Sequence, residues 1–201
     1  MKRSRVFTII IVAVILVAVV AGFAFSLNRR AKATAEAEEA RVTAVQSVLM
    51  RDLERSYPPT AKEVVKYFAE ITQCFYNEEY TDEELTQMAE KIQGIYDDEL
   101  IANKSQEDYL NDLRSEIASM KESNYTISGY VLSASVDVEE FVENGYSCAR
   151  LYCTFNVKQG TLGTTRSMEE FVLRKDEDGH WKIYGWQLVE GKSQKCAATK
   201  I

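Results

Sequence analysis

The longest uninterrupted apolar stretch of the chain, VFTIIIVAVILVAVVAGFAFSL, covers residues 6–27 and contains no charged residue. As a helix it would measure about 33 Å, at about 1.5 Å per residue, which spans a hydrocarbon layer of about 30 Å. A cleaved signal peptide is the alternative, but its apolar core is shorter, about 7–15 residues, and ends at a small-x-small site. The stretch predicts a transmembrane signal-anchor that follows a cytoplasmic tail of residues 1–5.

Basic residues lie on both sides of this stretch. Three lie before it and three follow it within residues 28–32, so the positive-inside count is almost a tie. The terminal amine adds one charge to the first group. We therefore expect a single-pass protein of the cell membrane with its amino terminus inside and its C-terminal domain outside the cell.

A charged, helix-forming segment comes next, over residues 31–55, and it contains neither Gly nor Pro. Its narrow apolar stripe consists of Val42, Val45, Leu49 and Leu53. This stripe could pair two copies weakly into a homodimer through residues 31–55, or it could rest on the chain's own domain. Because Pro58 and Pro59 stop a helix, we expect a linker over residues 28–57, a folded domain over residues 58–191 and a C-terminal tail over residues 192–201.

Apolar residues then recur at spacings of three and four behind Thr60, Thr81 and Ser105. Each of these residues is followed three positions later by an acidic residue, which is typical of a helix N-terminus. We expect three helices here, ending near residues 76, 94 and 120.

After Asn124 the apolar spacing changes from near four to near two, which is typical of strands. Four segments are rich in aromatic and β-branched residues: TISGYVLSASVDV, GYSCARLYCTFNV, TTRSMEEFVLRK and HWKIYGWQLV. Asp178-Gly179 tolerates the positive φ of a tight hairpin, and Gly129 would form a bulge that lets the sheet curl. The predicted fold class is α+β, with the transmembrane helix, three helices and a curled antiparallel sheet of about four strands.

The net charge of −7 argues against negatively charged binding partners. Residues after the apolar stretch are more acidic still, because Lys2, Arg3 and Arg5 precede it. Such a surface repels nucleic acid and anionic lipid head groups, so we expect no nucleic-acid partner.

The four cysteines allow disulfides without requiring them. Cys148 and Cys153 lie on opposite faces of one strand and cannot pair. Cys153 shares its face with apolar residues, which predicts a buried thiol in the core. Cys148 could form a disulfide with Cys196, and Cys74 would then have no partner. With one His and no CxxC spacing, we predict no metal ligand and no cofactor.

Two resemblances extend this interpretation. The order of helices and bent sheet, ending in FVLRKDEDGHWKIYGWQLVE, resembles the cone-shaped (cystatin-like) fold of nuclear transport factor 2 and ketosteroid isomerase over residues 58–191. More closely, YPPTAKEVVKYFAEITQCFYNEEYTDEEL and DGHWKIYGW are similar to an uncharacterised family of single-pass membrane proteins from Gram-positive gut clostridia. This resemblance implies a cell-surface domain and no particular activity. The fold hosts enzymes, ligand binders and secretion subunits, so it does not select a function.

No residue set predicts a catalytic site. Enzymes of the cone fold use an Asp or His inside the cone with a Tyr or Asp as oxyanion donor, whereas His180 reads as an exposed turn residue. Glu169 and Glu170 interrupt the apolar end of a strand, where one of them could face inward, although a solvated outer face explains both more simply.

The excess of aromatic residues in the strands is more informative. A concave sheet could present Tyr130, Tyr152, Tyr184 and Trp186 to a ligand, although packing against helices or in cross-strand pairs explains them as well. We expect a non-enzymatic surface module that binds a protein partner or a small ligand. The alternative is a small-molecule enzyme of the isomerase or dehydratase type that uses the cone cavity.

Overall fold

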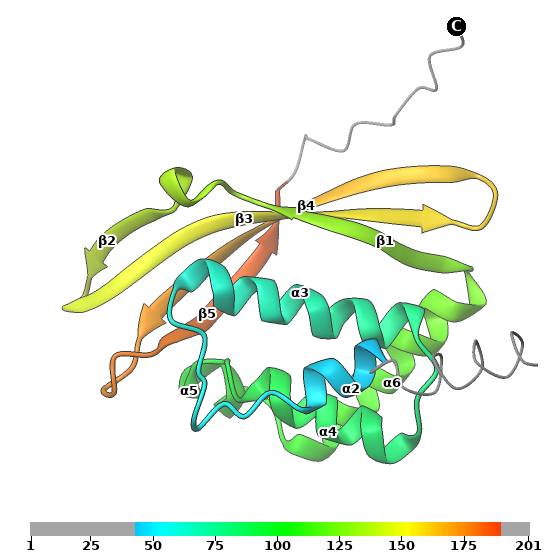
Figure 1. The fold of residues 1–201 in the computed structure, drawn as a ribbon, viewed down its shortest axis with the longest axis horizontal. Helices are drawn as coiled ribbons and strands as arrows, with labels where there is room; N and C mark the ends of the chain where they lie inside the picture. The colour runs from blue at the N-terminus through cyan, green and yellow to red at the C-terminus, as the bar shows by residue number, and fades with distance from the viewer. Residues whose placement is uncertain (1–42, 190–201) are drawn as a thin grey trace, which may run out of the picture. The chain divides into compact units, whose positions relative to one another are not determined.

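Five α-helices precede a five-stranded antiparallel sheet in residues 43–189, the part of the chain that the computed structural model describes. The helices are α2 (Ala44–Leu49), α3 (Ala61–Asn77), α4 (Asp82–Gln93), α5 (Asp98–Ala102) and α6 (Gln106–Glu122). The strands are β1 (Tyr125–Leu132), β2 (Glu139–Glu143), β3 (Tyr146–Gln159), β4 (Gly163–Lys175) and β5 (Trp181–Leu188). Figure 1 shows the helices on one side of the sheet, with α3 lying along it. The α+β order predicted from the sequence is confirmed.

The transmembrane part of the predicted fold class needs correction. No helix within residues 43–189 is both long and apolar enough to cross a membrane. The longest ones, α3 and α6, have 17 residues each and carry charged faces, whereas a span needs about 20 apolar residues. The predicted anchor over residues 6–27 lies outside the described residues, as do the predicted tails over residues 1–5 and 192–201.

The predicted helix starts are confirmed by their caps. Thr60 Oγ1 accepts a hydrogen bond from the Glu63 amide at 3.2 Å, and Ser105 Oγ accepts one from the Asp108 amide at 3.1 Å. Thr81 and Glu84 form a complete capping box at the start of α4. Each cap satisfies an amide that the helix leaves without a partner, so these starts are fixed by local chemistry.

The sequence predicted a helix that continues to residue 55, whereas α2 ends at Leu49 in the structure. Lys91 donates to the Arg51 carbonyl at 2.7 Å, and the Asp52 carboxylate accepts from the Glu54 amide at 3.0 Å, so these backbone groups form a turn instead of a further helical turn. Val45 and Val48 of α2 are buried against α3 and α4. The compact unit therefore starts at Ala44, upstream of the boundary at residue 58 that the sequence predicted.

The apolar stripe on this segment faces the domain. Val45 is 3% exposed, and Leu49 and Leu53 pack on the hydrophobic core, while Val42 lies outside the described residues. Tyr67 of α3 holds α2 in place by donating its hydroxyl to the Val48 carbonyl at 2.7 Å. Of the two readings that the sequence left open for this stripe, contact with the chain's own domain holds for Val45, Leu49 and Leu53.

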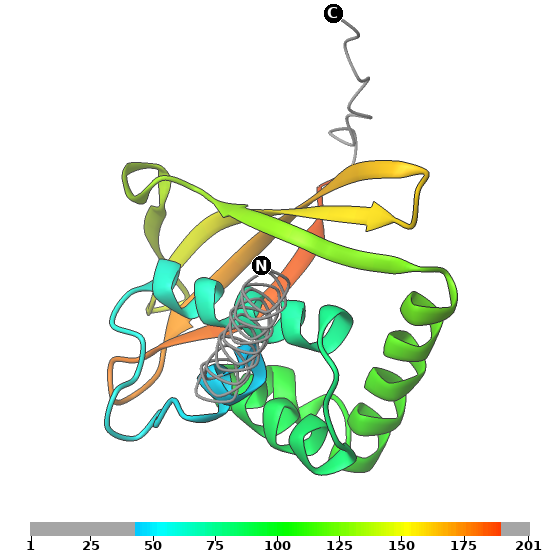
Figure 2. The same ribbon diagram turned by 45° about the vertical axis from the view of Figure 1, so that its right-hand side comes forward.

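The sheet has five strands where about four were predicted, because β1 ends at Leu132, before the end of the first predicted strand, and residues 139–143, outside every predicted strand, form β2. β1 and β2 both pair with the long strand β3, and a 3-10 turn at Ser135–Asp137 separates them. The Ser133 hydroxyl accepts a hydrogen bond from the Tyr152 amide at 2.9 Å where the chain leaves β3. Figure 2 shows the resulting arch of strands over the helices. The register of β1 shifts between Ile127 and Gly129, which confirms the predicted bulge.

Side chains of β3 and β4 alternate between an inner face, toward the helices, and an outer face. Leu151, Cys153, Phe171 and Leu173 are fully buried on the inner face. Cys153 is therefore a core thiol as predicted, and burial raises its pKa to about 12. Three cysteines, those at positions 74, 148 and 153, are free and buried, while Cys196 lies outside the described residues.

Candidate functional site

A cavity of about 360 Å³ lies between the inner face of the sheet and helices α3, α4 and α6; we call it the inner cavity. Its lining is largely aromatic and aliphatic, with carboxylates and hydroxyl groups among the apolar side chains. The lining residues are Phe68, Thr72, Phe75, Tyr76, Ile92, Tyr96, Lys104, Tyr109, Asp112, Leu113, Glu116, Met120, Ile127, Phe155, Val157, Ser167, Glu169 and Trp186. The side chains of Lys104 and Asp112 are 47% and 66% exposed, so the rim of the cavity reaches solvent.

Trp186 supplies an exposed aromatic wall. It pairs directly with Phe171 across β4 and β5, and the two rings stack at 6.1 Å. Phe68 of α3 and Tyr96 approach the same indole at 5.2 and 5.5 Å. Phe68, Tyr96 and Phe171 are buried, whereas Trp186 remains 40% exposed. Trp186 is one of the residues that line the inner cavity, so its ring can contact a molecule that enters it.

Glu169 is the polar group that stands out in this cavity. It pairs with the buried Cys153 in the β3–β4 register, which places its side chain on the inner face. Burial, together with the negative charge of Glu116 on α6, raises the pKa of Glu169 to about 7. Of the two readings that the sequence left open, the inward one holds for Glu169. The sequence already indicated this placement, because alternation along a strand puts Glu169 on the same face as the apolar Phe171 and Leu173.

The tyrosines in the cavity lie close to one another or to a carboxylate. Tyr76 donates to Glu116 Oε1 at 2.6 Å, and Tyr96 and Tyr109 lie close enough that each affects the pKa of the other. Burial is the largest cause of the raised pKa of Tyr76 and Tyr96, so both stay protonated at neutral pH. The cavity therefore combines neutral hydroxyls with three carboxylates, those of Asp112, Glu116 and Glu169, and the pKa of Glu169 lies near neutrality.

The raised pKa of Glu169 predicts a specific pH dependence of stability. The folded state holds a proton that the unfolded chain releases above its ordinary pKa of 4.5, so this contribution is complete below that pH and is lost as the pH rises through about 7. Between a pH of about 5 and about 8, the wild type should therefore lose about 1–3 kcal/mol of unfolding free energy that Glu169→Gln does not lose. Urea unfolding at both pH values measures it. Glu170→Gln, on the outer face, is the matched control, and parallel pH profiles for wild type and Glu169→Gln would contradict the inward placement.

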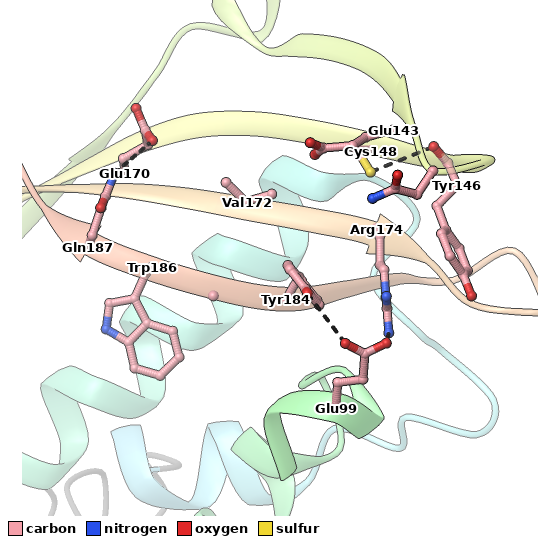
Figure 3. A pocket seen from close by; sticks show the side chains of 12 residues that line it. Glu99, Glu143, Tyr146, Cys148, Glu170, Val172, Arg174, Tyr184, Trp186 and Gln187 are labelled. Carbon is pink, nitrogen blue, oxygen red and sulfur yellow. Dashed lines mark hydrogen bonds and ion pairs between the residues drawn. The ribbon is translucent and has the colours of Figure 1, made fainter. Parts of the chain in front are cut away.

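A second hollow, of about 590 Å³, lies over the outer face of β3, β4 and β5; we call it the outer groove. Figure 3 shows Arg174 and Tyr184 directed toward Glu99 of α5. The Arg174 guanidinium donates to both oxygens of the buried Asp97 and, at 2.8 Å, to Glu99. It also lies 4.7 Å from the Tyr146 ring and 4.6 Å from the Tyr184 ring. The Nε and Nη2 donors of this cation are therefore occupied by carboxylates of its own chain.

The four residues predicted to bind a ligand do not form one site. Trp186 lines the inner cavity, and it also borders the outer groove with Tyr184. Tyr152 lies on the outer face and donates to Glu170 Oε2 at 2.8 Å. Tyr130 faces inward and packs against Phe155, outside both hollows. The sequence missed Glu169 as the polar partner of Trp186.

One turn gathers possible metal-ligating groups in the part of the chain that the structure describes. Asp176, Asp178 and His180, between β4 and β5, bring one potential ligand atom each to within 4.8 Å of one another. His180 Nδ1 lies 3.8 Å from Asp176 Oδ2, and its ring stacks on Tyr57 at 4.3 Å. His180 thus contacts Asp176 within the turn and Tyr57 before α3, and it lines neither hollow.

Comparison with known proteins identifies the family and adds no activity. A family model described as a domain of unknown function, DUF6715, matches residues 1–186. This range includes every residue of the inner cavity, ending at Trp186 itself. No curated protein matches the chain. Because the match covers nearly the whole sequence, the chain belongs to the DUF6715 family.

Proposed function

We propose that the domain is a binding module that takes a small, partly apolar ligand into the inner cavity and does not transform it. The observation that carries this proposal is that two side chains line the same cavity, the exposed ring of Trp186 and the carboxylate of Glu169. Small-molecule sites are mostly apolar hollows with a few polar groups that fix orientation. The inner cavity has this composition.

The sequence resemblance supports the same choice. In the cone-shaped fold of nuclear transport factor 2 and ketosteroid isomerase, functional residues lie inside the cone, between sheet and helices. The inner cavity is likewise lined by residues of the sheet and of the helices. We infer a fold of this kind, and a cell-surface role as in the clostridial family that the sequence resembles.

A protein partner on the outer face has less support. Arg174 binds Asp97 and Tyr152 donates to Glu170, so these polar groups of the outer face bond within the chain, whereas the buried Nε of Arg150 has no hydrogen-bond partner among the described residues. The charges of Arg174 and Glu170 are therefore largely compensated, which leaves less for a partner to match.

Proton transfer is a second candidate function, and one observation favours it. The carboxylate of Glu169 titrates near pH 7 in a cavity that also holds the hydroxyl of Tyr76. A base with a pKa near the working pH, beside a hydroxyl donor, is the arrangement that isomerases and dehydratases use. Conversion of a bound ligand, followed by mass spectrometry, would favour this function over binding alone.

Two-dimensional amide NMR of the full chain tests the binding proposal, because the protein has only two tryptophans and hence two indole signals. With a library of small aromatic fragments, we expect shifts of the Trp186 indole and little change at Trp181, which is 7% exposed. Trp186→Ala should weaken binding about tenfold or more, since an aromatic contact contributes roughly 0.5–1.5 kcal/mol beyond its buried area.

Tyr152→Ala is the matched control, because it removes an aromatic side chain from the outer face and leaves the inner cavity intact. It should bind the fragments as the wild type does. Trp186 borders both hollows, so the other lining residues decide between them: shifts at Tyr146 and Tyr184 without shifts at Phe68 and Tyr109 would instead place the binding site in the outer groove and overturn the proposal.

A further inference from the structure

The charges around Glu169 are unbalanced toward the negative. Glu116 on α6 faces it and is itself occupied by the Tyr76 hydroxyl. Lys104 is the basic residue of the cavity lining, and it forms an ion pair with Asp112 at the rim. Among the described residues, no Lys or Arg forms an ion pair with Glu169. The remaining titratable groups near it, Tyr96, Tyr109 and Cys153, are neutral at physiological pH.

The aromatic wall lies within reach of this carboxylate. Glu169 and Phe171 are successive inner-face residues of β4, and Trp186 stands directly opposite Phe171 on β5. Trp186 is therefore the diagonal neighbour of Glu169, at a spacing of about 7–8 Å between Cα atoms. A single small molecule can touch both side chains at once.

We propose that the ligand of the inner cavity is an organic cation, an amine or quaternary ammonium group on an apolar body, with its charge between Glu169 and the Trp186 ring. This inference rests on the proposed function. An unpaired carboxylate supplies the counter-charge, and the face of a tryptophan attracts cations through its quadrupole. The buried rings of Phe68 and Tyr96 provide an apolar surface for the body of the ligand.

The inference predicts a linkage between binding and protonation. A cation stabilises the ionised carboxylate, so its binding lowers the pKa of Glu169 from about 7 and releases a proton. Affinity for the cation should rise about tenfold or more from a pH of about 5 to about 8 and then level off. A neutral ligand gains nothing from ionisation, so its affinity should not rise over this range.

Isothermal titration of the full chain with phenyltrimethylammonium and its neutral isostere tert-butylbenzene separates charge from shape. We expect the cation to bind at least about tenfold more tightly at a pH of about 8, and to lose that advantage in Glu169→Gln. The Glu170→Gln control should retain it. Glu169→Gln is expected to fold, because it removes a charge that burial disfavours.

Equal affinity for the two probes, or an unchanged preference in Glu169→Gln, would overturn the cation assignment and leave the cavity as a site for a neutral ligand. If neither probe binds the wild type and the Trp186 indole signal does not move, the proposed function itself fails. These two results are distinct, so each conclusion is tested separately.

Discussion

Arg174→Met should lower the free energy of unfolding by about 3–5 kcal/mol, because it leaves a buried carboxylate without its cation. Asp97 is only 5% exposed, and the Arg174 guanidinium donates to both of its oxygens. Methionine retains much of the side-chain volume between the rings of Tyr146 and Tyr184, so the loss reports chiefly on charge. Urea unfolding at a pH of about 7 measures the effect.

Two further variants separate this effect from a general loss of surface charge. Arg150→Met removes a more exposed arginine, whose Nη1 lies 3.2 Å from Glu139, and should cost less than about 1 kcal/mol. The double variant Asp97→Asn with Arg174→Met should be more stable than Arg174→Met alone, since no unpaired buried charge remains. If Arg174→Met costs no more than Arg150→Met, the pair with Asp97 does not hold α5 to the sheet.

The second large effect concerns the start of the domain. Val48→Asp should destabilise the protein by about 3 kcal/mol or more, because it places a carboxylate at a position that is 5% exposed in the core. Val48 lies in α2, and its carbonyl accepts the hydroxyl of the buried Tyr67. The substitution therefore tests whether α2 belongs to the folded domain. Chemical unfolding of the full chain gives the measurement.

Met50→Asp is the matched control, two residues further on and 73% exposed. It introduces the same charge and should change stability by no more than about 0.5 kcal/mol. If the two variants unfold alike, α2 does not contribute to the core, and the domain boundary lies near residue 58, as the sequence predicted.

Local features of the fold could be predicted from the sequence because each depends on a few neighbouring residues. The caps at Thr60, Thr81 and Ser105 bind amides three positions away. Gly179 adopts a φ of +81° in the predicted β4–β5 turn. The change of apolar spacing after Asn124 likewise predicted the order of helices and strands, since burial on one face imposes that spacing.

Long-range contacts determined the features of the fold that the sequence did not predict. Just after α2 ends, the Arg51 carbonyl accepts a hydrogen bond from Lys91, forty positions away, and the unpredicted strand β2 forms by pairing with β3, as β1 does. Neither contact leaves a signal in the nearby sequence. A helix-forming composition over residues 31–55 was therefore a poor guide to where α2 ends.

The candidate site shows the same limit most clearly at β5. Trp186 is an odd number of residues from the buried Ile183, so strict alternation would place the two on opposite faces. A register shift opposite Val172 and Leu173 inserts one extra residue in β5 and turns Trp186 inward beside Phe171. The sequence alone supplied an inward parity for Glu169 and an aromatic residue at position 186. Only the tertiary structure placed both in one cavity, because the bulge that reverses the alternation is set by the pairing of β4 with β5.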